Sequence, residues 1–301
     1  MKINMLSEYL TNKYGKKIYK LSLSSGLSCP NRDGKIGVGG CIFCSGSGAG
    51  EFAQCSKESI HTQIDTAKKM LSQKLQNEDG YIAYFQPFSN TYGSIEYLRK
   101  LYTEVINRDD IKILSIATRP DCLDEEKIKF FAELNKIKPV WIELGLQTIH
   151  EHTAKYIRRG YPLEIYKNIA KQLKDNGINV ITHLILGLPN ESKNDMVESA
   201  KLAGKYSDGL KFHMLYIQKN TDICKDYNKG MFKSLEKDEY IDILCECLRF
   251  VPEDVVIHRI TGDCEKESLI SPLWSADKLK VLRDIKNAFY DRDIVQGEKL
   301  K

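Results

Sequence analysis

Three cysteines near the amino end of this chain constrain its fold and chemistry more than any other feature. Cys29 is followed by Cys41 after eleven residues, and Cys44 completes a Cys-x-x-Cys pair. Thiolates are the usual ligands of iron–sulfur clusters. Three of them without a close fourth suit a [4Fe–4S] cluster that keeps one iron free for an outside ligand. The segment is rich in glycine, which allows the backbone to wrap closely around a bulky group.

Other interpretations of these cysteines stay open. A structural zinc ion needs four ligands, and Cys55 or His61 is the nearest candidate for the fourth. A thioredoxin-like dithiol accounts for Cys41 and Cys44 but leaves Cys29 unexplained. Three unrelated buried thiols fit poorly with a loop that contains so much glycine.

Length, cysteine usage and charge limit the class of protein. A chain of 301 residues allows one large α/β domain. Nine cysteines, an odd number without a disulfide-like framework, indicate a reducing compartment. Residues 1–20 show no signal peptide, and no run of 18 apolar residues suggests a membrane span. We therefore expect a cytoplasmic protein without membrane contact. The net charge of +4 is compatible with RNA binding, and no DNA partner is expected.

Short β-branched runs alternate with amphipathic stretches along the chain. Strands are expected at residues 17–23, 81–86, 112–118, 140–146, 179–186, 209–217 and 255–261. Helices are expected at residues 58–76, 94–107, 163–176, 192–205, 236–249 and 275–290, with another after Asp124. Consecutive βα units predict an α/β fold with a partial (βα)6-type, TIM-like barrel. We expect residues 1–220 to form this barrel and residues 221–301 to form a small carboxyl-terminal extension that packs on it and selects the substrate.

Polar or glycine-rich segments follow each expected strand. In such barrels the chemistry lies on the loops at the carboxyl ends of the strands. The cysteine loop follows the first strand, and the later strand ends carry Gln86 to Gly93, Thr118 to Asp121, Gln147, Gly187 to Pro189 and Gln218 to Thr221. The sequence therefore predicts one functional rim formed by all of these segments.

Three motifs beyond the cysteines carry a likeness to a known family. Phe43 stands directly before the last cysteine, the segment from Glu143 to Gln147 precedes Arg159-Gly160, and His183 begins a run that ends in Gly-Leu-Pro. With these motifs the chain resembles a radical S-adenosylmethionine (SAM) enzyme over about residues 17–220. It is most similar to the Elongator-subunit branch, and within it to a shorter bacterial group in which we expect no acetyltransferase domain.

The resemblance implies a site, residue by residue. Cys29, Cys41 and Cys44 would each hold one iron, and the methionine moiety of SAM would chelate the fourth. The remaining contacts to SAM would be Phe43 to adenine, Arg159 to the carboxylate, Gln147 to the ribose or methionine end, His183 to the ribose, and Gln86, Ser89, Asn90 and Thr91 to the ammonium. An arginine suits the carboxylate because its guanidinium can bind both oxygens and keeps its charge.

Several of these side chains have plainer alternatives. Arg159 could instead bond the last carbonyls of the helix around residues 150–158. His183 could be a hydrogen-bonded core histidine. Asn90 and Thr91 could simply form a turn.

The resemblance also implies the chemistry. An external one-electron donor of the flavodoxin or ferredoxin type would reduce the cluster, which would cleave SAM to methionine and a 5′-deoxyadenosyl radical. That radical would abstract hydrogen from a substrate. Because the cofactor carries this chemistry and the protein positions it, no catalytic acid, base or nucleophile of the chain is expected.

The carboxyl-terminal third is expected to contact the substrate. Arg259 and Asp263 belong to a polar segment that ends a strand, and a hydrogen-bonded turn is the alternative. Cys224 or Cys264 could reach the barrel mouth as a hydrogen donor, whereas the other cysteines are expected to be buried and inert. Frequent lysines in residues 219–237 and 278–301, with the Elongator likeness, predict an RNA substrate, tRNA first. The alternatives are the same chemistry on a small metabolite, or a non-catalytic iron–sulfur or zinc-binding module.

Overall fold

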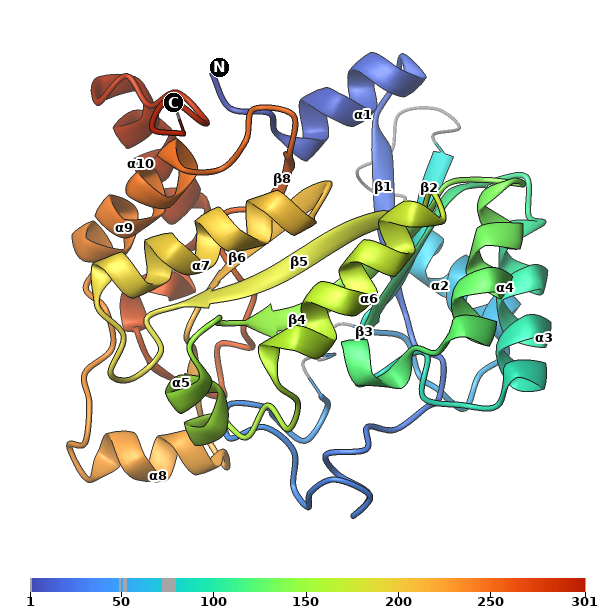
Figure 1. Ribbon diagram of the computed structural model, residues 1–301, viewed down its shortest axis with the longest axis horizontal. Helices are drawn as coiled ribbons and strands as arrows, with labels where there is room; N and C mark the ends of the chain where they lie inside the picture. Colours follow the sequence, from blue (N-terminus) through green and yellow to red (C-terminus); the bar gives the residue numbers. More distant parts are fainter. Residues whose placement is uncertain (1, 49, 51–52, 72–79, 301) are drawn as a thin grey trace.

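A curled, seven-stranded parallel sheet forms the centre of the computed structural model, which describes residues 2–48, 50, 53–71 and 80–300 (Figure 1). The strand order is β1-β2-β3-β4-β5-β6-β8, so neighbours in the sequence are neighbours in space. The bounds are β1 (Ile18–Leu23), β2 (Gly80–Phe85), β3 (Ile111–Thr118), β4 (Val140–Gln147), β5 (Asn179–Leu186), β6 (Gly209–Met214) and β8 (Val256–Arg259). The expected α/β fold with a partial barrel is confirmed.

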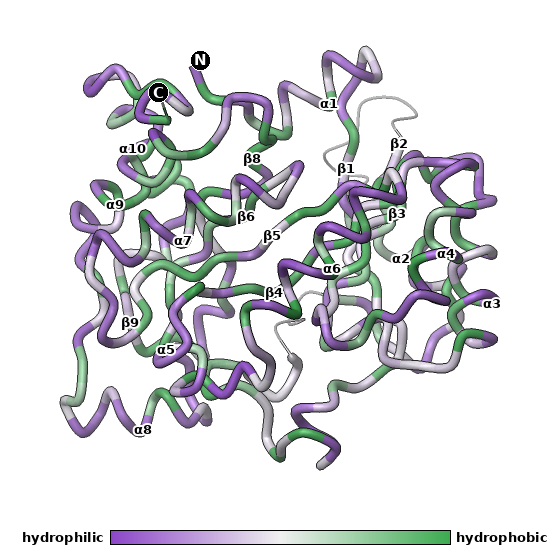
Figure 2. The backbone as a smooth tube through the Cα atoms, viewed as in Figure 1, coloured by the Kyte–Doolittle hydropathy of each residue, from purple (hydrophilic) through white to green (hydrophobic). Residues whose placement is uncertain are grey.

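Amphipathic helices cover the outer face of the sheet. They are α2 (Ile60–Leu71), α3 (Ile95–Ile106), α4 (Glu125–Asn135), α6 (Leu163–Asp175), α7 (Lys193–Tyr206), α9 (Lys237–Arg249) and α10 (Lys278–Asp291). Ser94 and Asp124 cap α3 and α4 by accepting backbone N–H bonds, as the sequence predicts. Figure 2 shows largely hydrophobic strands and helices of mixed polarity. Residues 72–76 of the helix expected at 58–76 lie outside the described residues.

The inside of the barrel is filled at the amino ends of its strands. Because side chains alternate along a strand, Ile82 and Tyr84 of β2 point inward while Ala83 and Phe85 join the outer core. Leu10 of α1 (Leu6–Tyr14) packs on the inward cluster and closes this end. Among the described residues, the open space inside the barrel lies toward the carboxyl ends of the strands.

The expected strand at residues 209–217 is wrong in its second half. The chain leaves the main sheet after Met214, and β7 (Ile217–Gln218) pairs antiparallel with β9 (Leu269–Ser271) instead. The pairing of β7 with β9, which lies far along the chain, outweighs the continuous apolar pattern of residues 209–217. Strand β8 comes from the expected extension, residues 221–301, yet pairs with β6. The division at residue 220 stays a prediction.

The remaining short elements lie around the carboxyl ends of the strands. They are α5 (Glu151–Tyr156), α8 (Asp222–Asn228) and the 3-10 helices at Pro120–Cys122 and Leu273–Ala276. Within the described part of the chain, no helix has the length and apolar character needed to cross a bilayer.

Candidate functional site

A cavity with an empty volume of about 910 Å³ opens at the carboxyl ends of the strands, and we call it the cysteine cavity. A second cavity of about 740 Å³, the β8 cavity, adjoins it. Both are lined by Phe43, Gln86, Gln147, His183, His213 and Arg259, and therefore form one continuous chamber. Its walls come from β2, β3, β4, β5, β6 and β8 and from the cysteine loop, as the strand-end argument predicts.

Cys29, Cys41 and Cys44 all line the cysteine cavity. Their loop is held by the helices that follow β4 and β7. The Ile42 N–H donates to the Ile157 carbonyl at 3.2 Å, and the Ile42 carbonyl accepts from the Ile223 N–H at 3.0 Å. The apolar side chains of these three residues pack in one buried cluster. The cysteines therefore have a defined position before any ligand binds.

Two polar side chains brace the loop from within. The Asn31 Nδ2 donates to the Arg158 carbonyl at 2.6 Å, and the Arg32 guanidinium donates to the carbonyls of Cys44 and Ser45. Gly40 lines the cavity with φ +87°, and a Cβ there would lie 3.0 Å from the Arg32 Nε. Glycine is therefore required at this position both by conformation and by space.

The electrostatics favour thiolate at one cysteine. A hydrogen bond with Cys44 lowers the pKa of Cys41 to about 7, and the cations of Arg119 and Arg32 act in the same direction. The same pairing, with burial, raises the pKa of Cys44 well above its ordinary value. A lowered thiol pKa favours metal binding, because the thiolate is the ligand.

Among the described residues, the three thiols do not form a compact set of ligands for a single zinc ion. Three thiolates on one tetrahedral zinc would place their sulfurs about 3.8 Å apart. Around the loop, within the described residues, no three ligand atoms of cysteine, histidine, aspartate or glutamate lie within 4.8 Å of one another. Cys55 is exposed, and His61 pairs with Glu104 on the outer helices, so neither completes a zinc site in the cavity.

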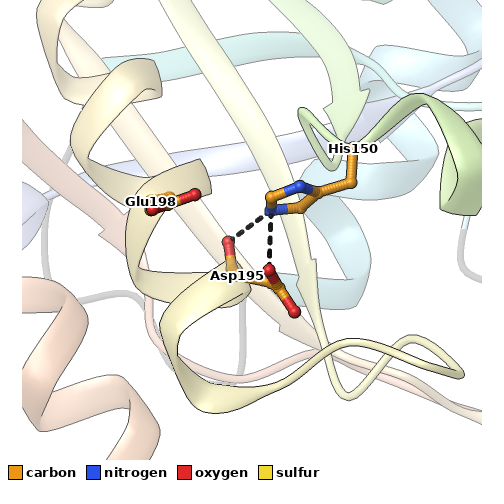
Figure 3. A group of neighbouring side chains, drawn as sticks. All are labelled: His150, Asp195 and Glu198. Atoms are coloured by element: carbon orange, nitrogen blue, oxygen red, sulfur yellow. Dashed lines mark hydrogen bonds and ion pairs between the residues drawn. The ribbon is translucent and has the colours of Figure 1, made fainter.

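One group of potential metal ligands does meet that distance, but it lies elsewhere. His150, Asp195 and Glu198 gather where α5 and α7 begin (Figure 3). The His150 Nε2 bonds the Asp195 carbonyl oxygen at 3.0 Å, and Asp195 forms the capping box of α7 with Ser192. The role of these contacts is structural: they connect the first turn of α7 with the start of α5.

Four of the predicted SAM contacts line both cavities: Phe43, Gln86, Gln147 and His183. Gln147 is unusual because its φ is +69° and its buried Oε1 has no hydrogen-bond partner in the described part of the chain. Gly145 makes room for it, since a Cβ there would lie 2.9 Å from the Gln147 Nε2. Strained backbone with an unpaired polar atom is typical of a ligand contact.

Arg159 lines the cysteine cavity, and most of its donors have partners within the fold. Its side chain is buried, and its Nε donates to the Tyr161 carbonyl at 2.9 Å and its Nη1 to the Thr148 carbonyl at 2.6 Å. Its Nη2 pairs with Glu151 at 3.1 Å. The guanidinium thus bonds the backbone between β4 and α6, which is close to the carbonyl-bonding alternative, and its contact with a ligand carboxylate stays a prediction.

Asn90 and Thr91 have structural partners within the fold, and their ligand contacts stay predictions. The Asn90 Nδ2 donates to the carbonyls of Phe85 and Ala117 at 3.0 and 2.8 Å, and its Oδ1 accepts from the Ser25 hydroxyl. The Thr91 hydroxyl shares a 2.6 Å bond with Thr118. Both residues are fully buried outside the cavity lining. Ser89, their neighbour, does line the cysteine cavity.

Replacing Asn90 with alanine should lower the free energy of unfolding by about 2–3 kcal/mol, because two buried carbonyls and a hydroxyl lose their partner. Urea unfolding of the variant would measure this. The exposed Asn287→Ala on α10 is the control and should change stability little. An equally small effect of Asn90→Ala would contradict the bracing role.

A buried charged network lies beneath the cavity, and sequence reasoning missed most of it. The Glu143 carboxylate of β4 accepts from the Ser115 hydroxyl and from the His183 Nε2, both at 2.6 Å. Lys211 of β6 pairs with it, and Lys20 of β1 lies 3.5 Å away. The sequence did contain a signal for this network, because Lys20 and Lys211 each interrupt an apolar strand. A lysine at an inward position of a strand needs a buried partner of opposite charge.

This network fixes protonation states. Burial alone would raise the pKa of Glu143, but Lys211 and Lys20 outweigh it and hold that pKa well below its ordinary value. Burial, with the Lys211 charge, lowers the pKa of His183 to about 4. His183 is therefore neutral at pH 7, and its Nε2 must carry the proton because a carboxylate only accepts.

The predicted substrate residues lie together in the β8 cavity. Arg259 and Asp263 form an ion pair at 3.2 Å, and Lys278 pairs with the same carboxylate. Cys224 and Cys264 are outside both linings. Cys224 is buried beneath the cysteine loop, and the Cys264 sulfur accepts from the Gln218 Nε2 at 3.1 Å.

Comparisons with known proteins agree with this geometry. The family described as "Radical SAM superfamily" matches residues 29–203, and the "Radical_SAM C-terminal domain" matches residues 207–291. Uncharacterized protein YtqA of Bacillus subtilis is 40% identical over 97% of this chain and 91% of its own length. The tRNA uridine(34) acetyltransferase of Methanocaldococcus infernus is 28% identical over 50% of this chain but only 28% of its own length.

A solved structure has the same fold. Elp3 of the archaeon Methanocaldococcus infernus superposes with a TM-score of 0.65 and 19% identity, over 78% of this chain and 59% of the other. At that identity the likeness concerns the fold.

Proposed function

Because the chain belongs to the radical SAM superfamily and is therefore a radical SAM enzyme, we propose that Cys29, Cys41 and Cys44 hold its [4Fe–4S] cluster and that SAM binds in the chamber beside them. The observation that carries this proposal is that all three thiols line one cavity at the carboxyl ends of the strands. When bound, the reduced cluster and SAM supply a 5′-deoxyadenosyl radical for hydrogen abstraction.

The chain's own residues bind and orient in this proposal. Phe43 offers an aromatic surface and Gln147 an unpaired carbonyl oxygen to SAM. Glu143 fixes the His183 ring, and the Nε2 proton leaves Nδ1 as the acceptor for a hydroxyl group. The walls formed by the strand ends exclude water from the reacting groups.

We propose an external electron donor of the flavodoxin or ferredoxin type. Reduction of the cluster needs an electron from a redox partner. Cys245 and Cys247 are buried on α9.

An RNA substrate, with tRNA as the first choice, is supported by two observations. A relative named for action on tRNA uridine(34) matches half of this chain. Exposed lysines also surround α8, among them Lys219 and Lys229, and α8 bonds the cysteine loop through Ile223. Lysines at the mouth of the chamber suit contacts to a phosphate backbone.

A small metabolite is the second candidate. The β8 cavity is concave and has a few convergent polar groups on an otherwise apolar wall, which is typical of small-molecule sites. Such a substrate would fit entirely inside the chamber.

Formation of 5′-deoxyadenosine by the anaerobically reconstituted enzyme tests this function. Bulk tRNA should stimulate it by about tenfold at low salt, and the stimulation should weaken as salt rises. The double variant Lys219→Glu/Lys229→Glu should lose most of the stimulation, whereas the double variant Lys280→Glu/Lys286→Glu on α10 is the charge-matched control. Stimulation by a small-molecule extract but not by tRNA would assign the second candidate. Absence of SAM cleavage in every mixture would contradict the proposed chemistry.

A further inference from the structure

Positive charge exceeds negative charge where the two cavities meet. The side chains of Lys20 and Lys211 surround the single carboxylate of Glu143. Arg259 lies close enough to disfavour protonation of His183 and His213. Within the described residues its ion-pair partner, Asp263, is shared with Lys278. Burial lowers the pKa of Lys20 and of Lys211, whereas the Glu143 carboxylate favours their charged forms. Four basic side chains therefore meet two carboxylates in this set, so an anionic group would be stabilised there.

Arg259 differs from the other arginines that line the chamber. Arg32 bonds backbone carbonyls of its own loop, and Arg119 bonds both oxygens of Asp121 and the Arg159 carbonyl. Arg159 uses most of its donors in bonds to its own part of the fold. Arg259 at the end of β8 makes one ion pair, at 3.2 Å, and faces both cavities. Its planar guanidinium therefore has N–H groups available to donate to a carboxylate or a phosphate.

Two further polar groups on the same wall have no partner. The Nε2 of His213 and the Oε1 of Gln147 are buried and without a hydrogen bond within the described residues. Both residues line both cavities with Arg259. A buried polar atom without a partner costs free energy, so such atoms mark a place where a ligand supplies the missing bond. A neutral His213 whose Nε2 carries the proton would donate to the same anion as Arg259, whereas the Gln147 Oε1 only accepts and is left for a donor group of SAM.

We propose that the substrate presents an anionic group, a carboxylate or a phosphate, to Arg259 and His213 in the β8 cavity. Asp263 and Lys278 hold the guanidinium in place without neutralising the site. This inference rests on the proposed function, since it names the chemical class of its substrate. The group can belong to a nucleotide of an RNA or to a small acid.

Protection of Arg259 from an arginine-specific dicarbonyl reagent tests the anion site without cofactor or substrate. The protein is treated with phenylglyoxal in acetate, phosphate or chloride at equal ionic strength, and modification is measured for each arginine by mass spectrometry. Acetate or phosphate should slow modification of Arg259 at least about threefold relative to chloride. Arg99, exposed on α3, is the control and should be indifferent to the anion. Equal rates at Arg259 in all three salts would overturn the proposal.

Kinetics of the loaded enzyme provide the second test. Arg259→Gln should raise the KM for the stimulating substrate at least about tenfold, and Arg259→Lys should recover only part of that loss, because an ammonium cannot bind bidentately. Arg283→Gln on α10 is the matched control. If tRNA stimulates formation of 5′-deoxyadenosine, the anionic group belongs to the RNA. If a small-molecule fraction stimulates it instead, the anionic group belongs to a small acid.

These outcomes separate failure of this inference from failure of the proposed function. If Arg259→Gln weakens SAM binding as strongly as it weakens the response to substrate, Arg259 serves the cofactor and the inference is wrong. An unchanged KM would also overturn it. If the unmodified enzyme never forms 5′-deoxyadenosine, the proposed function fails, while the protection experiment still decides whether an anion site exists.

Discussion

Glu143→Ala is expected to lower the free energy of unfolding by about 3–5 kcal/mol, which is the typical cost of leaving a buried charge without its partner. Glu143 is fully buried, and its carboxylate is the partner of Lys211, which is also almost fully buried. The Ser115 hydroxyl and the His183 Nε2 would lose their acceptor as well. Chemical denaturation of the variant and the unmodified protein would measure the difference.

The double variant Glu143→Ala/Lys211→Met separates the charge from the packing. Removing both charges should recover most of the lost stability, because an apolar side chain then replaces the buried ammonium. Glu125→Ala, which breaks an exposed ion pair with Lys129, is the control and should behave like the unmodified protein. A double variant as unstable as Glu143→Ala would show that the loss does not come from an uncompensated Lys211.

The same network predicts a dependence on pH. The pKa of Glu143 is lower in the folded chain than in the unfolded chain, where it is about 4.3. Its contribution is therefore present above that value and is lost as the pH falls toward the folded pKa. The difference in stability between the unmodified protein and Glu143→Ala should be constant near neutral pH and shrink below about pH 4.

Each of the variants Cys29→Ala, Cys41→Ala and Cys44→Ala is expected to abolish formation of 5′-deoxyadenosine and to lose most of the bound iron. Three thiolates bind three of the four irons and leave one open for SAM. Removal of one thiolate leaves a second iron without a protein ligand, so the cluster is held too weakly. Iron and sulfide content, the visible absorption of the cluster and the assay of 5′-deoxyadenosine would be measured after anaerobic reconstitution.

Cys55→Ala is the matched control, because Cys55 is exposed and outside the cavity lining. It should retain both iron and activity. Zinc in place of iron in anaerobically purified protein would favour the metal-binding alternative instead. Full activity in any one of the three cavity variants would contradict the assignment of the cluster ligands.

Local sequence determined the elements and singled out the loop that we propose as the cofactor loop. Alternating β-branched runs and amphipathic stretches predict β1 to β6 and their helices, since period and capping act over a few residues. Ser94 and Asp124 cap their helices as predicted. The spacing of Cys29, Cys41 and Cys44 is enough to identify the loop, and the rule for parallel strands places it on the rim with Gln147 and His183.

Only the tertiary structure decided how the polar side chains are used. Arg159 and Asn90 are the right residue types for a ligand contact, and the fold brings backbone carbonyls close enough to bind most of their donors. Glu143 and Lys211 are 68 residues apart, and their pairing depends on the curvature of the sheet. Hydrogen bonds are short-ranged and saturable, so the final role of each polar group follows from which partners the fold brings within about 3 Å.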